Sequence, residues 1–181
     1  MILITGAAGH IGNVLVRELV NDSNDVRALI LPGEDTTSLE GLPVEIMEGN
    51  VLDPKSLDKA MQGVDLVFHL AGIISIVPGQ DELMQRVNVE GTRNVLAAAR
   101  KAGVKRLVYT SSIHALSRDW KGKIDETVPF DPENQAGGYD RTKAQASLAV
   151  LEAVQQGLDA VIVCPTGVVG PYDYRGSEMG D

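Results

Sequence analysis

Tyr139 and Lys143 are the two residues of this chain whose types and spacing best fit proton-transfer chemistry. Positions i and i+4 share one face of an α-helix, so a phenol and an ammonium can address one substrate from the same side. A free tyrosine titrates near pH ~10, and a neighbouring positive charge favours its phenolate form. The pair therefore predicts a general acid/base whose pKa the lysine lowers. The alternative is an ordinary amphipathic helix that carries a surface ion.

A glycine-rich segment at residues 5–12, Thr-Gly-Ala-Ala-Gly-His-Ile-Gly, follows a short apolar run at residues 1–4. Apolar residues then recur at helical spacing, and a strand, a glycine turn and a helix in this order predict a nucleotide site. Gly6 permits the tight turn, Gly9 lets the backbone approach a diphosphate, and Gly12 lets the helix pack closely on the strand. We expect the diphosphate on the free N–H groups of that helix. The alternative is a glycine-rich turn without a ligand.

Further short motifs follow in a fixed order. They are Asp53 after Gly-Asn-Val-Leu, His-Leu-Ala-Gly at residues 69–72, Asn88 within Val-Asn-Val-Glu-Gly-Thr, the pair Ser111 and Ser112, the Tyr139 and Lys143 pair, and Pro-Thr-Gly-Val-Val-Gly-Pro at residues 165–171. With these motifs the chain resembles the extended short-chain dehydrogenase/reductases, a group of NAD(P)-dependent sugar epimerases, dehydratases and dihydroflavonol-reductase-like enzymes. The resemblance runs from residue 1 to about residue 174.

The resemblance implies a role for each residue of these motifs. Tyr139 would be the general acid/base, and Lys143 would lower its pKa and hydrogen-bond the nicotinamide ribose. Ser112 would hold the substrate oxygen, with Ser111 as the alternative because the strand register is uncertain by one residue. The serine pair also fits a plain strand-end turn. Asn88 fits a capping or helix-distorting side chain as well as a role in the site.

The resemblance also implies the cofactor contacts. Asp53 would face the adenine, and Val168 would offer backbone groups to the carboxamide, although residues 165–171 also fit an ordinary strand-exit turn. The full cofactor-binding set is Gly6, Ala8, Gly9, His10, Ile11, Gly12, Val51, Leu52, Asp53, Leu70, Ala71, Gly72, Asn88, Thr110, Ser111, Tyr139, Lys143, Pro165 and Val168.

The choice between NAD and NADP depends on the residues after the second strand. Related enzymes often carry an aspartate or an arginine there, whereas this chain has Ile-Leu-Pro at residues 30–32. Glu34 and Asp35 follow and would repel a 2′-phosphate, so the sequence slightly favours NAD. Epimerases commonly carry Tyr-Gly five residues after the catalytic serine, where this chain has Leu-Ser at residues 116–117. This difference favours the reductase or steroid-dehydrogenase-like branch.

Alternating strand and helix patterns predict an α/β fold, a Rossmann doubly wound parallel sheet in three layers with strand order 3-2-1-4-5-6. We expect a long loop at residues 113–138, which leads directly to Tyr139. The strands are expected at residues 2–5, 26–30, 44–48, 65–70, 105–110 and 159–164, and the helices at residues 10–21, 54–61, 81–102 and 137–156.

Composition excludes several function classes. With 181 residues and a net charge of -9, the chain fits one domain and not a nucleic-acid binder. Cys164 is the only cysteine and the three histidines are scattered, so no metal site is expected, and His114 is interpreted as a surface residue. We expect a cytoplasmic protein that acts on a small-molecule substrate without a membrane partner, and a homo-oligomer stays open.

The extent of the chain bears on its activity. Members of the family that it resembles normally continue well past residue 181, into a lobe that binds the substrate. We therefore expect residues 1–181 to form the dinucleotide-binding domain, with the substrate lobe largely absent. The alternative function is an NAD(P)-binding module without turnover.

Overall fold

Six parallel strands form one sheet in the computed structural model of the chain, which describes residues 1–75, 79–174 and 176. Their order is β3-β2-β1-β4-β5-β6, so the predicted Rossmann topology is confirmed. Each strand begins and ends within one residue of its predicted range. The strands are β1 (Ile2–Thr5), β2 (Val26–Ile30), β3 (Glu45–Glu48), β4 (Leu66–His69), β5 (Arg106–Thr110) and β6 (Ala160–Val163).

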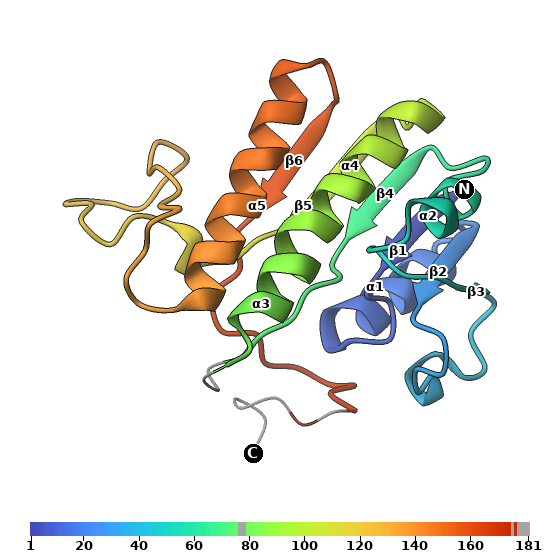
Figure 1. The fold of residues 1–181 in the computed structure, drawn as a ribbon. Coiled ribbons are helices and arrows are strands. Elements are labelled where there is room, and N and C mark those ends of the chain that lie inside the picture. Colours follow the sequence, from blue (N-terminus) through green and yellow to red (C-terminus); the bar gives the residue numbers. More distant parts are fainter. Residues whose placement is uncertain (76–78, 175, 177–181) are drawn as a thin grey trace.

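The helices cover both faces of this sheet (Figure 1). The predicted helix at residues 81–102 is a succession of an α-helix, a π-helix and a second α-helix, and the predicted loop at 113–138 contains a 3₁₀ turn and an isolated bridge between Leu116 and Phe130. The helical elements are α1 (His10–Asn21), η1 (Thr37–Leu39), α2 (Pro54–Ala60), α3 (Asp81–Met84), η2 (Gln85–Glu90), α4 (Gly91–Ala102), η3 (Ile113–Ala115) and α5 (Gly138–Gln155).

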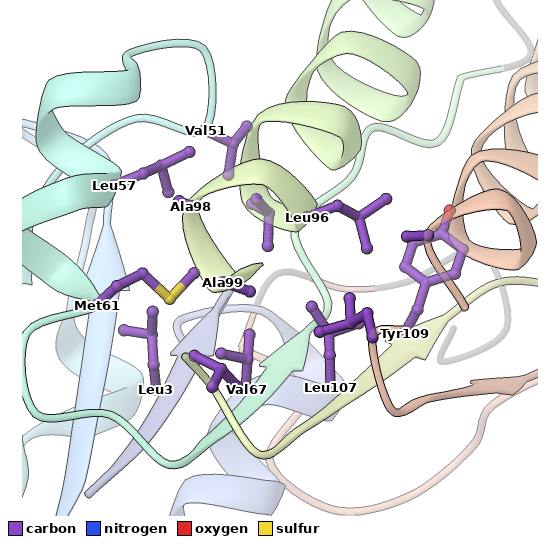
Figure 2. Close-up of a cluster of buried hydrophobic side chains, with 14 of the residues drawn as sticks. Leu3, Val51, Leu57, Met61, Val67, Leu96, Ala98, Ala99, Leu107 and Tyr109 are labelled. Carbon is purple, nitrogen blue, oxygen red and sulfur yellow. The ribbon is translucent and has the colours of Figure 1, made fainter. Parts of the chain in front are cut away.

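Two apolar cores hold the strands between the helices. Leu3 and Ile4 are successive residues of β1, and they enter different cores because strand side chains alternate between the two faces. The larger core joins β1, β4 and β5 to α2, α4 and α5, and Figure 2 shows Leu3, Val67 and Leu107 pointing toward its helices. The smaller core lies under α1 and η1. The strands are thereby fixed with their carboxyl ends along one edge of the sheet.

The glycine turn brings three segments to this edge. Gly6 has φ +71°, and a Cβ there would lie 2.7 Å from the backbone nitrogen of Ala71. A Cβ on Gly12 would lie 2.1 Å from the carbonyl oxygen of Gly6. Both positions therefore require glycine, which agrees with the tight turn and the close helix packing expected of them. None of the described helices is long and apolar enough to span a membrane.

Candidate active site

The amino end of α1 opens onto the carboxyl edge of the sheet. Gly9 is the N-cap residue, no side chain caps the helix, and its first turn contains no acidic residue. The first N–H groups of an α-helix have no partner within the helix, and the helix dipole makes this end positive. A Cβ on Gly9 would approach only the Gly6 carbonyl oxygen, at 3.3 Å, so the turn leaves its outer side open. These features fit a diphosphate on the N–H groups of α1.

Asn13 fixes this turn, and the glycine motif did not identify it. Its side-chain nitrogen donates to the carbonyl oxygens of Gly9 at 2.9 Å and of His10 at 3.1 Å. The same nitrogen lies 3.1 Å from the carbonyl oxygen of Tyr172, in the segment that follows β6. Asn13 is fully buried, but an asparagine in the first turns of a helix is common, so its role could not be predicted from the sequence.

Lys143 lies one turn after Tyr139 on α5, as the spacing predicts, and its amine is buried. The Nζ atom donates to the carbonyl oxygen of Thr110, at the end of β5, at 2.6 Å, and lies 4.7 Å from the centroid of the Tyr109 ring. Burial lowers the pKa of Lys143 to about 8. A Cβ on Gly72 would lie 3.8 Å from Nζ, so the amine also borders the end of β4.

The Tyr139 phenol is half-buried at the start of α5. Burial raises its pKa above the ordinary value, the hydrogen bond with the Ser112 side chain acts in the opposite direction, and the charge of Asp140 raises the pKa further. The pKa is thus raised, whereas the sequence predicted that Lys143 would lower it. The Lys143 amine is held by Thr110 at the strand end, and its charge is not among the causes of the shift.

The two serines after β5 have different partners. The Ser111 hydroxyl is paired with the buried Ser147 hydroxyl at 2.6 Å. The Ser112 hydroxyl accepts a hydrogen bond from the backbone N–H of His114 at 3.1 Å and acts to lower the pKa of the Tyr139 phenol. Of the two alternatives that the sequence left open, the geometry favours Ser112 as the serine beside the acid/base.

Asn88 lies in the π-helical segment η2, and its buried side chain joins three segments. Its oxygen accepts from the N–H of Ile73 at 2.7 Å, and its nitrogen donates to the Ile73 carbonyl oxygen at 3.0 Å and to the Thr142 hydroxyl at 3.1 Å. Asn88 thus lies in a distorted helical segment, in agreement with one of the two alternatives, and its role in the site stays a prediction. Short π segments in helices are frequent at functional sites.

The segment after β3 carries the residues predicted to face the adenine. The Asp53 carboxylate caps α2 by accepting from the backbone nitrogen of Lys55 at 3.0 Å, and Val51 is buried. The Asn50 side chain accepts from the backbone nitrogen of Leu52 at 2.9 Å, and so shapes the turn between β3 and α2. Asp53 thus has a structural role at this end of the site, and its contact with adenine stays a prediction.

His114 and Asp140 lie beside the Tyr139 phenol. The His114 side chain is 55% exposed, in keeping with a surface residue, but its ring is edge-on to that of Tyr139 with centroids 6.3 Å apart. Its Nδ1 lies 3.7 Å from the Asp140 carboxylate, which Arg118 binds at 2.8 Å. This cluster was not predictable from the sequence, because an acidic residue in the first turn of a helix is ordinary.

The segment after β6 connects the serines with the glycine turn. The N–H of Ile113 donates to the Pro165 carbonyl oxygen at 3.0 Å, and Val168 lines a hollow of about 400 Å³ with His10 and Ile11. Figure 1 shows this segment crossing below the carboxyl ends of the strands toward α1. Pro165 and Val168 thus border the same edge as the other predicted residues. Among the described residues, no three histidine, cysteine or acidic side chains are grouped as metal ligands.

Comparison with known proteins defines the class to which this fold and site belong. The chain belongs to the 3-beta hydroxysteroid dehydrogenase/isomerase family, whose pattern matches residues 3–179. It is 40% identical over 178 residues to sterol demethylase protein B of Methylococcus capsulatus, covering 98% of this chain and 54% of that protein. It is 38% identical over 179 residues to a putative dihydroflavonol 4-reductase of Synechocystis, covering 98% of this chain and 52% of that protein.

Solved structures give the same assignment. The crystal structure of gox2253 matches with a TM-score of 0.89 and 35% identity, over 99% of this chain and 55% of that one. A short-chain dehydrogenase/reductase superfamily protein from Agrobacterium tumefaciens with bound NAD matches with a TM-score of 0.78 and 32% identity, over 91% of this chain and 48% of that one. The resemblance to the extended short-chain dehydrogenase/reductases is confirmed, and the chain spans about half the length of the relatives it matches.

The buried amine of Lys143 generates a stability prediction. The folded-state pKa of about 8 lies below the usual 10.5, so between these values the unfolded chain holds a proton that the folded chain has lost. Between these two pKa values, the free energy of unfolding of the wild type should therefore rise with pH relative to that of Lys143→Met. At ~1.4 kcal/mol per pH unit, the total rise is about 3 kcal/mol. Below pH 8 the difference should be constant, because Lys143 is charged in both states.

Urea unfolding of both proteins at a series of pH values measures this difference. Val150→Ala, which removes buried apolar volume from the same helix without changing a titratable group, is the control and should differ from wild type equally at every pH. The assignment of a buried amine with a lowered pKa would be contradicted if the difference in free energy of unfolding between wild type and Lys143→Met did not change between pH 8 and 10.5.

Proposed function

We propose that this chain is the cofactor-binding and proton-transfer part of a nicotinamide-dependent oxidoreductase. The reaction would transfer a hydride between the nicotinamide and a carbinol or carbonyl carbon of a small molecule. The observation that carries the proposal is the position of Tyr139 at the start of α5, one turn before Lys143, whose amine is bonded to the Thr110 carbonyl at the same sheet edge as the uncapped amino end of α1. An acid/base group and an anion cradle on one edge fit a redox cofactor whose reactive ring lies beside a substrate oxygen.

The cofactor supplies or takes the hydride, and the side chains of this chain handle the proton. The raised pKa of Tyr139 keeps the phenol protonated near neutral pH, so it can donate to the substrate oxygen during carbonyl reduction. The Ser112 hydroxyl would hold that oxygen and stabilise the charge that develops on it. Lys143, anchored to Thr110, would donate to the nicotinamide ribose from one turn further along α5.

We propose NAD in preference to NADP. The Glu34 carboxylate accepts from the backbone nitrogen of Leu31 at 2.9 Å, which holds a negative charge close to the end of β2. The end of this strand is where dinucleotide-binding folds recognise the ribose 2′ position, and a 2′-phosphate would be repelled there. The NAD bound to the Agrobacterium tumefaciens relative supports this preference.

For the substrate we propose a ketone, an aldehyde or the corresponding alcohol. Relatives with similar sequences include a 2-alkyl-3-oxoalkanoate reductase of Stenotrophomonas maltophilia, 35% identical over 177 residues, and the putative dihydroflavonol 4-reductase. The Leu-Ser pair at residues 116–117 also favours a reductase over an epimerase. Because the chain spans about half the length of its relatives, this activity is proposed for the whole protein. The 181 residues alone are expected to bind the cofactor and to turn over slowly.

The Gly9→Val variant tests the cofactor site. The branched side chain should cover the N–H groups at the start of α1 and keep a diphosphate from them. Loss of one hydrogen bond to a charged group costs ~1.5–3 kcal/mol, so the affinity for NAD should fall at least about tenfold. Isothermal titration calorimetry measures it, with circular dichroism as a check on folding. Asn21→Val, at the exposed far end of α1, is the matched control and should bind as wild type does. Unchanged NAD and NADP affinity in a folded Gly9→Val protein would rule this site out.

The Tyr139→Phe variant tests the proton donor. It removes the hydroxyl and keeps the ring, so the NADH affinity should stay within about threefold of wild type while any turnover falls by about 10²–10⁴. Turnover is followed as NADH oxidation with a panel of ketones and aldehydes, and Tyr174→Phe, which removes an exposed phenol, is the control. Equal activity in Tyr139→Phe would overturn the catalytic assignment. Cofactor binding without hydride transfer to any compound would favour the alternative, a binding module.

A further inference from the structure

A line of buried hydrogen bonds runs from the glycine turn to the π-helical segment. The backbone nitrogen of Ala71 lies 3.2 Å from the Thr5 hydroxyl, which lies 2.7 Å from Nδ1 of His69. On the other side of the ring, Nε2 lies 2.9 Å from the Thr92 hydroxyl, which lies 2.6 Å from the carbonyl oxygen of Asn88. Thr5, His69 and Thr92 are all fully buried. The activity proposed above assigns no role to these three side chains.

The Asn88 end of this line, together with the burial of the ring, fixes the direction of its bonds. At the other end the Thr5 hydroxyl accepts from the Ala71 N–H and still has its single hydrogen and a second lone pair, so its bond with His69 Nδ1 follows the state of the ring. The Asn88 carbonyl can only accept, so the Thr92 hydroxyl gives its single hydrogen there and must accept from His69 Nε2. Burial favours the neutral ring, so with its hydrogen on Nε2 the ring has a bare Nδ1, which accepts the hydrogen of the Thr5 hydroxyl.

The last bond of the line joins the start of α4 to the distorted helical segment. In a regular α-helix the Asn88 carbonyl would accept from the backbone nitrogen four residues later, which belongs to Thr92. The Thr92 hydroxyl also bonds to that carbonyl, and a threonine that bonds back to the i−4 carbonyl often bends a helix. The distorted segment η2 covers Gln85–Glu90 and is the part of the helix from which Asn88 reaches Ile73 and Thr142.

Asn88 in turn links the start of α5 to the segment that follows β4. The Thr142 hydroxyl, which accepts from the Asn88 amide, donates to the carbonyl oxygen of Tyr139 at 3.0 Å. The backbone of the acid/base residue is therefore connected through Asn88 to the end of β4. A buried, neutral His69 also suits this place, because desolvation and the nearby Lys143 charge lower its pKa to about 3.

We propose that His69, held in its Nε2–H tautomer between Thr5 and Thr92, is a positioning residue of the site. It orients the Thr92 hydroxyl toward the Asn88 carbonyl, and this contact maintains the π segment that aims the Asn88 amide at Ile73 and Thr142. His69 touches neither substrate nor cofactor. The inference rests on the proposed function for its significance, while the hydrogen-bond geometry itself is independent of any cofactor.

The tautomer is tested in the wild-type 181-residue chain without cofactor. Long-range ¹H–¹⁵N correlation spectra of the histidine rings distinguish a protonated from an unprotonated ring nitrogen. We expect His69 to be neutral near pH 7, with its hydrogen on Nε2 and a bare Nδ1. A hydrogen on Nδ1, or a doubly protonated ring, would overturn the proposal without any variant being made.

The positioning role is tested with Thr92→Val, which keeps the shape and removes the hydroxyl, and Thr92→Ser, which restores it. NMR measures the exchange of the Asn88 side-chain amide hydrogens with solvent. Exchange should be about fivefold faster or more in Thr92→Val and should return to the wild-type rate in Thr92→Ser. The control is Ser147→Ala, which removes a buried α5 hydroxyl paired with Ser111, and Asn88 should keep its protection in this variant. A folded Thr92→Val protein with wild-type exchange at Asn88 would refute the role.

If Thr92→Val does not fold, a second pair of variants tests the positioning role of His69. The amide of His69→Gln can still donate toward Thr92, whereas that of His69→Asn is too short, so Asn88 should keep its protection only in the glutamine variant. Equal protection in both would overturn the proposal. NADH titration of the wild-type chain separates this outcome from the function, since absent binding would refute the cofactor site and leave the His69 result unaffected.

Discussion

The contact between α1 and the ends of β1 and β4 leaves no room for a side chain at Gly6 or Gly12. Protein interiors are close-packed, so an added methyl group at either position would have to displace backbone. The contact fixes the amino end of α1 at the point where the winding of the sheet reverses. The uncapped N–H groups of α1, the end of β4 at Ala71 and the segment after β6 all meet there. The arrangement of the site depends on this one contact.

Polar groups gather at the same edge because parallel strands end there together and leave backbone groups that must be satisfied. The Thr110 carbonyl holds the Lys143 amine, and both polar groups of Ile73 are taken by Asn88. Such buried groups are costly unless they are paired, so the pairings also fix the positions of the side chains. Burial at this edge is also the largest cause of two pKa shifts, the lowered pKa of Lys143 and the raised pKa of Tyr139.

The sequence predicted the features that depend on local pattern. The strand order, the glycine turn and the common face of Tyr139 and Lys143 follow from periodicity and spacing, and the structure agrees with them. Features that depend on contacts between distant segments were not predictable. The contact between His69 and Thr92 joins residues 23 positions apart, and the raised pKa of Tyr139 depends on how the folded chain buries the phenol. Asn88 was left undecided for the same reason, because the asparagine side chain suits a helix distortion and a site equally well.

The central claim is that one dinucleotide spans the carboxyl edge from the glycine turn to Tyr139. A crystal structure of the chain grown with NAD tests it most directly. The account predicts the diphosphate on the N–H groups that follow Gly9, and the nicotinamide ribose within ~3.2 Å of the Tyr139 hydroxyl or the Lys143 amine. A dinucleotide bound at another surface, or a diphosphate away from the start of α1 with the ribose out of reach of α5, would contradict it.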